Sequence, residues 1–181
     1  MAEDSKVKQD LLSLRNPVLF IGGRIDEEAY NAAKRAIAFL MTRGSPPLKV
    51  IIDSRGGEAM SGLNIYDLIR LYENETEGTV YRMACSMASV VLQACTVRRC
   101  TRHSRILIHN VTGTDIRLDV MRKPKKLRKL QARLEERQKR IDAIYAMRSG
   151  KPVEFIHRIS AKNEMMPSEK ALEYGFIDEV V

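Results

Sequence analysis

The chain has 181 residues, with 31 Lys and Arg against 23 Asp and Glu, and its formal net charge is +8. Residues 122–140 hold ten basic and two acidic residues, so the excess lies there and the remainder carries 21 residues of each sign. A near-neutral chain with one basic segment is unlike a protein whose whole surface binds nucleic acid, although one local anionic partner stays open.

The length suits one domain with a proper core, and 44% apolar residues are ordinary for a soluble globular chain. We expect a short N-terminal tail at 1–15, which lacks the apolar core of a signal peptide, and a single domain at 16–181. No apolar run approaches the roughly 20 residues of a membrane span, so no membrane partner is predicted. Cys85, Cys95 and Cys100 lack metal-type spacing and cannot all pair, which favours a reducing cytoplasm and predicts no metal or cofactor.

The first half of the chain alternates apolar strands with amphipathic helices. Residues 18–21 form a short apolar run closed by two glycines, which predicts a buried strand. Asp26 can cap the helix that follows, in which apolar residues recur on one face. These residues are Ala29, Ala33, Ile37 and Leu40. A second strand at 48–52 and a second helix at 59–71 repeat the pattern.

The second half continues the alternation and adds one long helix. In chain order we expect a strand at 79–84, a buried helix at 87–97, a strand at 106–108, a long helix at 125–148, short helices at 153–160 and 168–174, and a closing strand at 176–181. Short strands that alternate with helices favour right-handed crossovers and a mainly parallel sheet. The fold class predicted from this pattern is α/β.

Two strand–helix junctions carry residues that suit a catalytic site. The paired glycines at 56–57 allow backbone N–H groups to face a cleft, although such a pair is more often a tight turn. Ser86 falls between a strand and a very apolar helix, where its hydroxyl could be exposed as a nucleophile, or where it could simply cap the helix. Cys85 is a rival nucleophile, but a buried inert thiol is the commoner case.

A histidine marks the third junction. His109 follows the strand at 106–108 directly and could reach a neighbouring junction as a general base, although a single histidine there is usually structural. His103 lies in a polar stretch and is expected to be solvated, and His157 is expected to be a surface or packing residue. Together the junctions predict a nucleophile, a base and N–H donors, with the serine before the histidine.

Four segments resemble the motifs of one family, the proteolytic subunit of the Clp (caseinolytic) protease, within the Clp protease/crotonase fold. They are 52–57, a glycine motif with Arg55 where the family usually has Pro; 83–89, the nucleophile motif; 105–110, the histidine motif; and 165–178, the C-terminal signature. The resemblance runs from about residue 15 to 181. It implies a spiral of βαβ units with a long protruding handle helix at about 122–148.

The resemblance implies a serine endopeptidase that acts on peptides or unfolded proteins. Ser86 would be the nucleophile and His109 the general base. The N–H groups of Gly57 and Met87 would form the oxyanion hole. A nucleophile, a base and two donors would then meet at one point.

The third member of the implied triad departs from the family. The position that is usually Asp is Asn163 here, and an amide can orient the histidine in Cys–His–Asn sites but stabilises its charge less well. Glu164 could orient His109 instead, or Asn163 could merely cap a turn. A catalytically weak or silent structural subunit is therefore the alternative function.

The resemblance also implies a homo-oligomer, a heptameric ring that can stack into a tetradecamer through the handle helix. A partnership with an AAA+ unfoldase is left open, because the aromatic docking residues are not evident at 48–52. An apolar stripe runs along the handle helix at Leu127, Leu130, Leu134, Ile141 and Ile144. Its charged faces are either simply solvated or meet like charges across stacked rings, which would make stacking salt-dependent. Nucleic-acid binding is not favoured, because no aromatic residues interleave with the basic ones.

Overall fold

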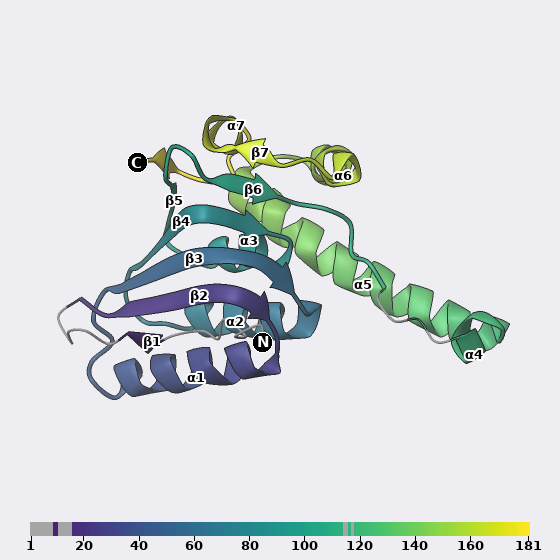
Figure 1. Ribbon diagram of the computed structural model, residues 1–181, viewed down its shortest axis with the longest axis horizontal. Helices are drawn as coiled ribbons and strands as arrows, with labels where there is room; N and C mark the ends of the chain where they lie inside the picture. Colours follow the sequence, from purple (N-terminus) through teal and green to yellow (C-terminus); the bar gives the residue numbers. More distant parts are fainter. Residues whose placement is uncertain (1–8, 11–15, 114–115, 117) are drawn as a thin grey trace, which may run out of the picture.

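The computed structural model of the protein describes residues 9–10, 16–113, 116 and 118–181, shown in Figure 1. Its sheet follows the order β1-β2-β3-β4-β5-β8, with β6 beside β4 and β7 beside β6. The strands are β1 (Gln9–Asp10), β2 (Val18–Ile25), β3 (Leu48–Gly57), β4 (Thr76–Cys85), β5 (Val97–Cys100), β6 (Arg105–Leu107), β7 (Met166–Pro167) and β8 (Glu179–Val180). Pairs β2–β3, β3–β4, β4–β5, β4–β6 and β5–β8 are parallel, which confirms the mainly parallel α/β sheet.

The helices follow the predicted order, with one short addition. They are α1 (Glu27–Met41), α2 (Ala59–Arg70), α3 (Met87–Leu92), α4 (Leu118–Met121), α5 (Pro124–Ser149), α6 (Val153–Lys162) and α7 (Ser168–Glu173). Asp26 caps α1 as predicted, because its carboxylate accepts a hydrogen bond from the N–H of Ala29 at 3.0 Å. None of the helices in the described ranges is both long and apolar enough to cross a membrane.

Helices α1, α2 and α3 cover one face of the sheet, as Figure 1 shows. Burial therefore alternates along β3, where Val50 and Ile52 are buried and Lys49 and Arg55 are exposed. The buried side chains of the strands and of these helices form one continuous hydrophobic core.

Several predicted boundaries were wrong. Gly22 and Gly23 do not end the first strand, because β2 continues to pair with β3 beyond a register shift at this point. The buried helix predicted at 87–97 ends at Leu92, and the polar-looking segment after it forms β5. The sequence pattern misled because Arg98 on β5 is buried and paired, whereas arginine is normally exposed.

The predicted N-terminal tail lies mostly outside the described residues. Only Gln9–Asp10 of the first 15 residues is described, and it pairs antiparallel with β2. These two residues form a short edge strand beside β2.

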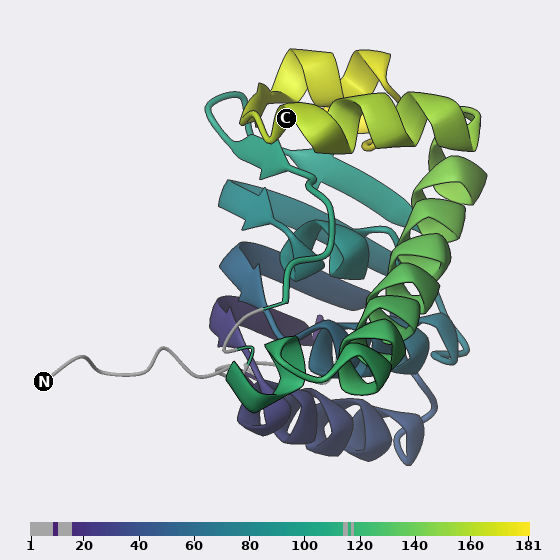
Figure 2. The same ribbon diagram turned by 90° about the vertical axis from the view of Figure 1, so that its right-hand side faces the viewer.

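Strand β4 has two different neighbours along its length, and this arrangement builds the site. Residues 77–80 pair with β5, whereas residues 83–85 pair with β6. The pairing of Cys85 with Leu107 brings the turn after β4 next to the segment after β6. Helix α5 begins at α4, far from the sheet, and its last turns lie beside α3 and β6 (Figures 1 and 2).

Candidate active site

Ser86 occupies a strained turn between β4 and α3. Its φ of 54° and ψ of −125° place a non-glycine residue in a left-handed region that costs about 1–3 kcal/mol. Its N–H donates to the carbonyl of Leu107 at 2.8 Å, and its side chain makes no capping hydrogen bond to α3. The capping role that the sequence left open is therefore absent, and the geometry is that of a nucleophile elbow.

The glycines at the end of β3 allow this strand to approach the elbow. Gly56 has φ +87°, and a Cβ there would lie 2.5 Å from the carbonyl oxygen of Cys85 and 2.9 Å from the nitrogen of Met87. A Cβ on Gly57 would collide with the carbonyl oxygen of Ile25. The pair is thus required for close packing of backbone against backbone, beyond its role in turning the chain.

Four of the predicted site residues line one cavity of about 60 Å³. They are Gly57, Ser86, Met87 and His109. Ile141 and Tyr145 of α5 form part of the same wall. The structure therefore brings together the serine, the histidine and the residues whose N–H groups were predicted to bind an oxyanion.

A larger cavity also has Gly57 in its lining. Its volume is about 520 Å³, and its polar lining includes Arg24, Asp53, Arg55 and Arg82. The exposed Arg55, which stands in place of the family's Pro, thus borders open space next to the serine turn and is not packed into the core.

His109 is oriented by the backbone beside it. Its Nδ1 lies 2.7 Å from the carbonyl oxygen of Asn110. A carbonyl only accepts hydrogen bonds, so Nδ1 must carry the proton, and Nε2 of the neutral ring keeps its lone pair. This tautomer is the one a general base needs, because the free nitrogen can accept the serine proton.

Asn163 and Glu164 lie away from this cavity. Asn163 ends α6 with φ 50° and ψ 42°, and its N–H donates to the carbonyl of Ser160 at 3.3 Å. Both side chains are exposed, and no hydrogen bond or ion pair within the described part of the chain joins either to His109. The backbone of Asn163 thus caps the C-terminal end of a helix, as the alternative of a purely capping residue predicts.

The remaining cysteine and histidine candidates are resolved by their surroundings. Burial raises the pKa of Cys85, and its thiol lies 3.7 Å from the sulfur of Met165, so it is a protonated, packed side chain. His103 and His157 are both exposed, as expected, and His157 also contacts the carboxylate of Asp142. Within the described ranges, no three His, Cys, Asp or Glu side chains form a group that could hold a metal ion.

Sequence reasoning missed three polar residues at the base of α5: Gln138, Asp142 and Tyr145. The Tyr145 hydroxyl lies 2.6 Å from Ser89 Oγ, which in turn donates to the carbonyl of Ser86 at 2.7 Å. Burial raises the pKa of Tyr145, so its hydroxyl stays protonated. The available signal was Asp142 itself, a lone carboxylate between the apolar residues of a helix stripe.

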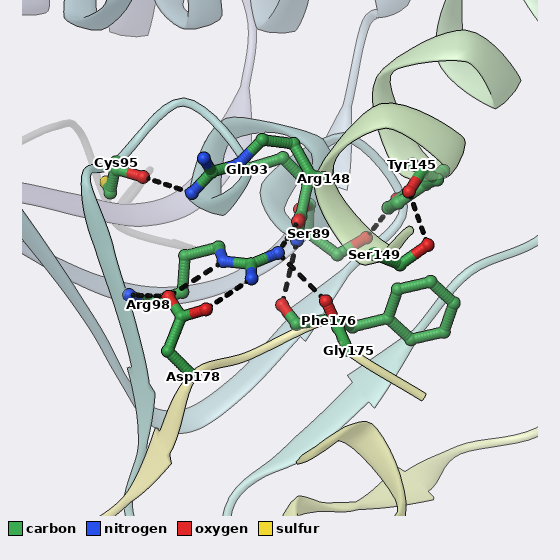
Figure 3. Close-up of polar contacts among 10 residues, drawn as sticks. All are labelled: Ser89, Gln93, Cys95, Arg98, Tyr145, Arg148, Ser149, Gly175, Phe176 and Asp178. Carbon is green, nitrogen blue, oxygen red and sulfur yellow. Dashed lines mark hydrogen bonds and ion pairs between the residues drawn. The ribbon is translucent and has the colours of Figure 1, made fainter. Parts of the chain in front are cut away.

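A polar network behind the cavity ties α5 and the C-terminal segment to the helix that follows Ser86 (Figure 3). Gln93 on the turn after α3 donates to the carbonyl of Phe176 at 3.1 Å and accepts from the buried Arg98 at 2.7 Å. Arg98 also pairs with Asp178, and Arg148 of α5 donates to the carbonyl of Cys95 at 2.7 Å. The base of α5 is thereby held against the site from two sides.

A strained serine between a strand and a helix, with a histidine from the adjacent strand in the same cavity, is typical of serine hydrolases. The sequence model of the family described as Clp protease matches residues 3–181. The ATP-dependent Clp protease proteolytic subunit 1 of Salinibacter ruber is 30% identical over 173 residues, which is 93% of this chain and 71% of that protein. The chain belongs to the Clp protease family, as its motifs indicated, and it has the mixed α/β fold expected from that resemblance.

Proposed function

We propose that the protein is a serine endopeptidase of Clp type that hydrolyses peptide bonds in peptides or unfolded proteins. The observation that carries the proposal is that Ser86, in a strained and half-buried turn, and His109, with Nε2 free, line the same cavity. Family membership supports the reaction class.

The chemistry follows from the positions of these groups. Ser86 Oγ attacks the substrate carbonyl while His109 Nε2 accepts its proton, and the C–N bond breaks as His109 returns that proton to the leaving amine. Water then hydrolyses the acyl-enzyme by the same proton transfers. The N–H groups of Gly57 and Met87 stabilise the oxyanion, and one such donor is worth roughly 10²- to 10³-fold in rate.

Asn163 as the third triad member stays a prediction. Its carboxamide would have to replace the Asn110 carbonyl at His109 Nδ1, so the segment that follows α6 would have to move. An Asn163→Ala variant tests this role: a large fall in kcat supports it, and an unchanged kcat removes it. The silent structural subunit remains the second candidate, because no described contact joins Asn163 to His109.

We propose assembly into a heptameric homo-oligomeric ring that encloses the sites and can stack through α5 into a tetradecamer. The support is family membership together with the projection of α5 beyond the sheet. The three buried free cysteines fit a reducing compartment, so we place the protein in the cytoplasm. The named relative is ATP-dependent, and whether an ATPase delivers substrate here is tested by adding one to the peptidase assay.

A fluorophosphonate probe tests the proposed function directly, because it reacts only with an activated serine. We expect the intact protein to be labelled, Ser86→Ala to lose the label, and Cys85→Ala to keep it as the matched control at the neighbouring position. Failure of the assembled, intact protein to react would reject the peptidase and favour the structural subunit.

A further inference from the structure

A continuous chain of hydrogen bonds links His109 to a buried carboxylate on α5. The peptide unit that accepts from His109 Nδ1 through the carbonyl of Asn110 also contains the N–H of Val111. That N–H donates to Gln138 Oε1 at 2.6 Å. The same amide donates from Nε2 to Asp142 Oδ1 at 2.8 Å. The peptide between residues 110 and 111 and the side-chain amide of Gln138 therefore each accept one hydrogen bond through the oxygen and donate one through the N–H.

The carboxylate at the end of this chain is almost completely removed from water. The Asp142 side chain is 3% exposed, whereas that of His157, which lies 2.9 Å from the other carboxylate oxygen, is 57% exposed. A buried carboxylate needs hydrogen-bond donors, and here Gln138 and His157 supply one to each oxygen. Tyr145, one turn along α5, has a pKa that burial raises, so it adds no charge beside Asp142.

The chain has the polarity that a general base requires. A negative charge on Asp142 polarises the amide of Gln138 so that its oxygen becomes more negative. This oxygen polarises the peptide unit between residues 110 and 111 in the same sense, so its carbonyl becomes a stronger acceptor for His109. The effect favours the charged imidazolium that forms as Ser86 loses its proton.

We propose that Asp142 is the positioning residue for His109 and acts through Gln138 and the peptide between residues 110 and 111. It supplies the negative charge that a neutral Asn163 does not carry, without touching the histidine. This inference rests on the proposed peptidase function and deepens it. The base of α5 thereby becomes part of the proton-transfer machinery.

The test uses the assembled full-length protein and measures the rate of fluorophosphonate labelling and of peptide hydrolysis as a function of pH. Asp142→Asn keeps the shape and the acceptor for Gln138 but removes the charge. We expect kcat to fall about tenfold with KM unchanged. The acid limb of the pH profile should shift to lower pH by about one unit, because one pH unit and a tenfold change in rate correspond to the same free energy. The limb moves down because the protonated imidazole loses stabilisation.

Asp67→Asn is the matched control, since it removes an equal charge from an exposed position on α2. It should leave the rate and the acid limb unchanged. If Asp142→Asn fails to assemble, Gln138→Met at the half-buried middle of the chain should produce the same fall and shift. A residue with a purely structural role would lower the amount of active protein without moving the limb.

Two results would overturn the inference. An unmoved acid limb in an assembled Asp142→Asn or Gln138→Met protein rejects the relay while leaving the peptidase intact. If the acid limb shifts in Asn163→Ala but not in the Asp142 variant, Asn163 is the residue that positions His109. By contrast, absence of labelling in the intact protein rejects the proposed function itself, so the two failures are distinguishable.

Discussion

The two halves of helix α5 have opposite surroundings. The basal half, from residue 138 to 149, contains the buried residues of the helix, Ile141, Asp142 and Tyr145. The outer half, from 124 to 137, contains no buried residue. One continuous helix therefore begins in solvent and ends as a wall of the candidate site.

The outer half carries half of the net charge of +8 that lies in residues 122–140. It holds six basic and two acidic residues. A cavity of about 440 Å³ lies beside it, lined by the apolar Leu130 and Leu134 and rimmed by basic side chains. The rim is Lys126, Lys129, Arg133 and Arg137. The difference shows that the basal half packs into the core and lines the candidate site, whereas the outer half presents an apolar hollow with basic side chains around it.

The largest expected difference between the two halves is in stability, and truncating one side chain in each half tests it. Tyr145→Ala removes a buried ring that packs edge-on against Phe176 at 5.6 Å, so we expect a loss of about 3–5 kcal/mol in the free energy of unfolding. Leu130 in the outer half is only half-buried, so Leu130→Ala should lower the free energy of unfolding by about 1 kcal/mol or less. Guanidinium unfolding followed by circular dichroism measures both, and equal losses would contradict the division.

Acid should weaken the network behind the basal half. Burial acts to raise the pKa of Asp178, but its hydrogen bonds to Arg98 prevail and hold that pKa below the ordinary 3.8. The resulting stability is present above pH 3.8 and is lost as the pH falls through the lower folded value. We expect this loss below about pH 4 in urea unfolding series at graded pH.

Asp178→Asn is the control for the acid effect. It should lower stability at neutral pH by about 1–2 kcal/mol, at the low end for charged hydrogen bonds because Asp178 is 41% exposed and screened by solvent. Its unfolding free energy should then depend less on pH in this range. An unchanged slope would show that other carboxylates cause the acid sensitivity.

A finer test concerns the hydroxyl of Tyr145 alone. Tyr145→Phe keeps the ring but removes the hydrogen bond to Ser89, so we expect a loss of about 0.5–1 kcal/mol in unfolding free energy. Labelling of Ser86 should persist, because Ser89 still donates to the Ser86 carbonyl. Complete loss of labelling in a folded variant would mean that the hydroxyl has a direct catalytic role.

The smallest effect on folding is expected in the outer half, where the effect on assembly should be clear. The double change Lys129→Gln and Arg133→Gln should alter unfolding by no more than about 0.5 kcal/mol. If like charges meet between stacked rings, the intact protein should stack more as salt rises, and the double variant should stack at low salt. Sedimentation velocity measures this, with Lys139→Gln in the basal half as control, and a tetradecamer that is unchanged at every salt concentration would refute the idea.

Much of the fold could be predicted because local patterns and tertiary packing agree. Apolar periodicity placed α2 and α5 within one residue of their observed ends, and Asp26 was recognised as the cap of α1. The pattern failed at β5, where a buried Arg98 satisfied by Asp178 looks like surface sequence. Asp178 lies 80 positions from Arg98 in the sequence, so the residues around Arg98 do not indicate this ion pair.

The candidate site divides in the same way. Ser86, His109 and the paired glycines could be proposed because each follows a strand, and parallel strands end at the same edge of a sheet. The contact between α5 and the segment after His109 could not be predicted. Gln138 bonds to Val111, 27 positions earlier, and Asp142 joins this chain only through Gln138, so the periodicity of the helix gives no sign of it.

By itself the sequence determined the family, the alternation of strands and helices, and the location of the basic charge, because all three depend on short segments of contiguous residues. Only the tertiary structure decided that Asn163 caps α6 while His109 is held by the peptide after it. It also decided that the basic helix has a buried base next to the serine. The reason is physical: burial and hydrogen-bond partners depend on distant segments, and they determine whether a polar residue is solvated surface or part of a site.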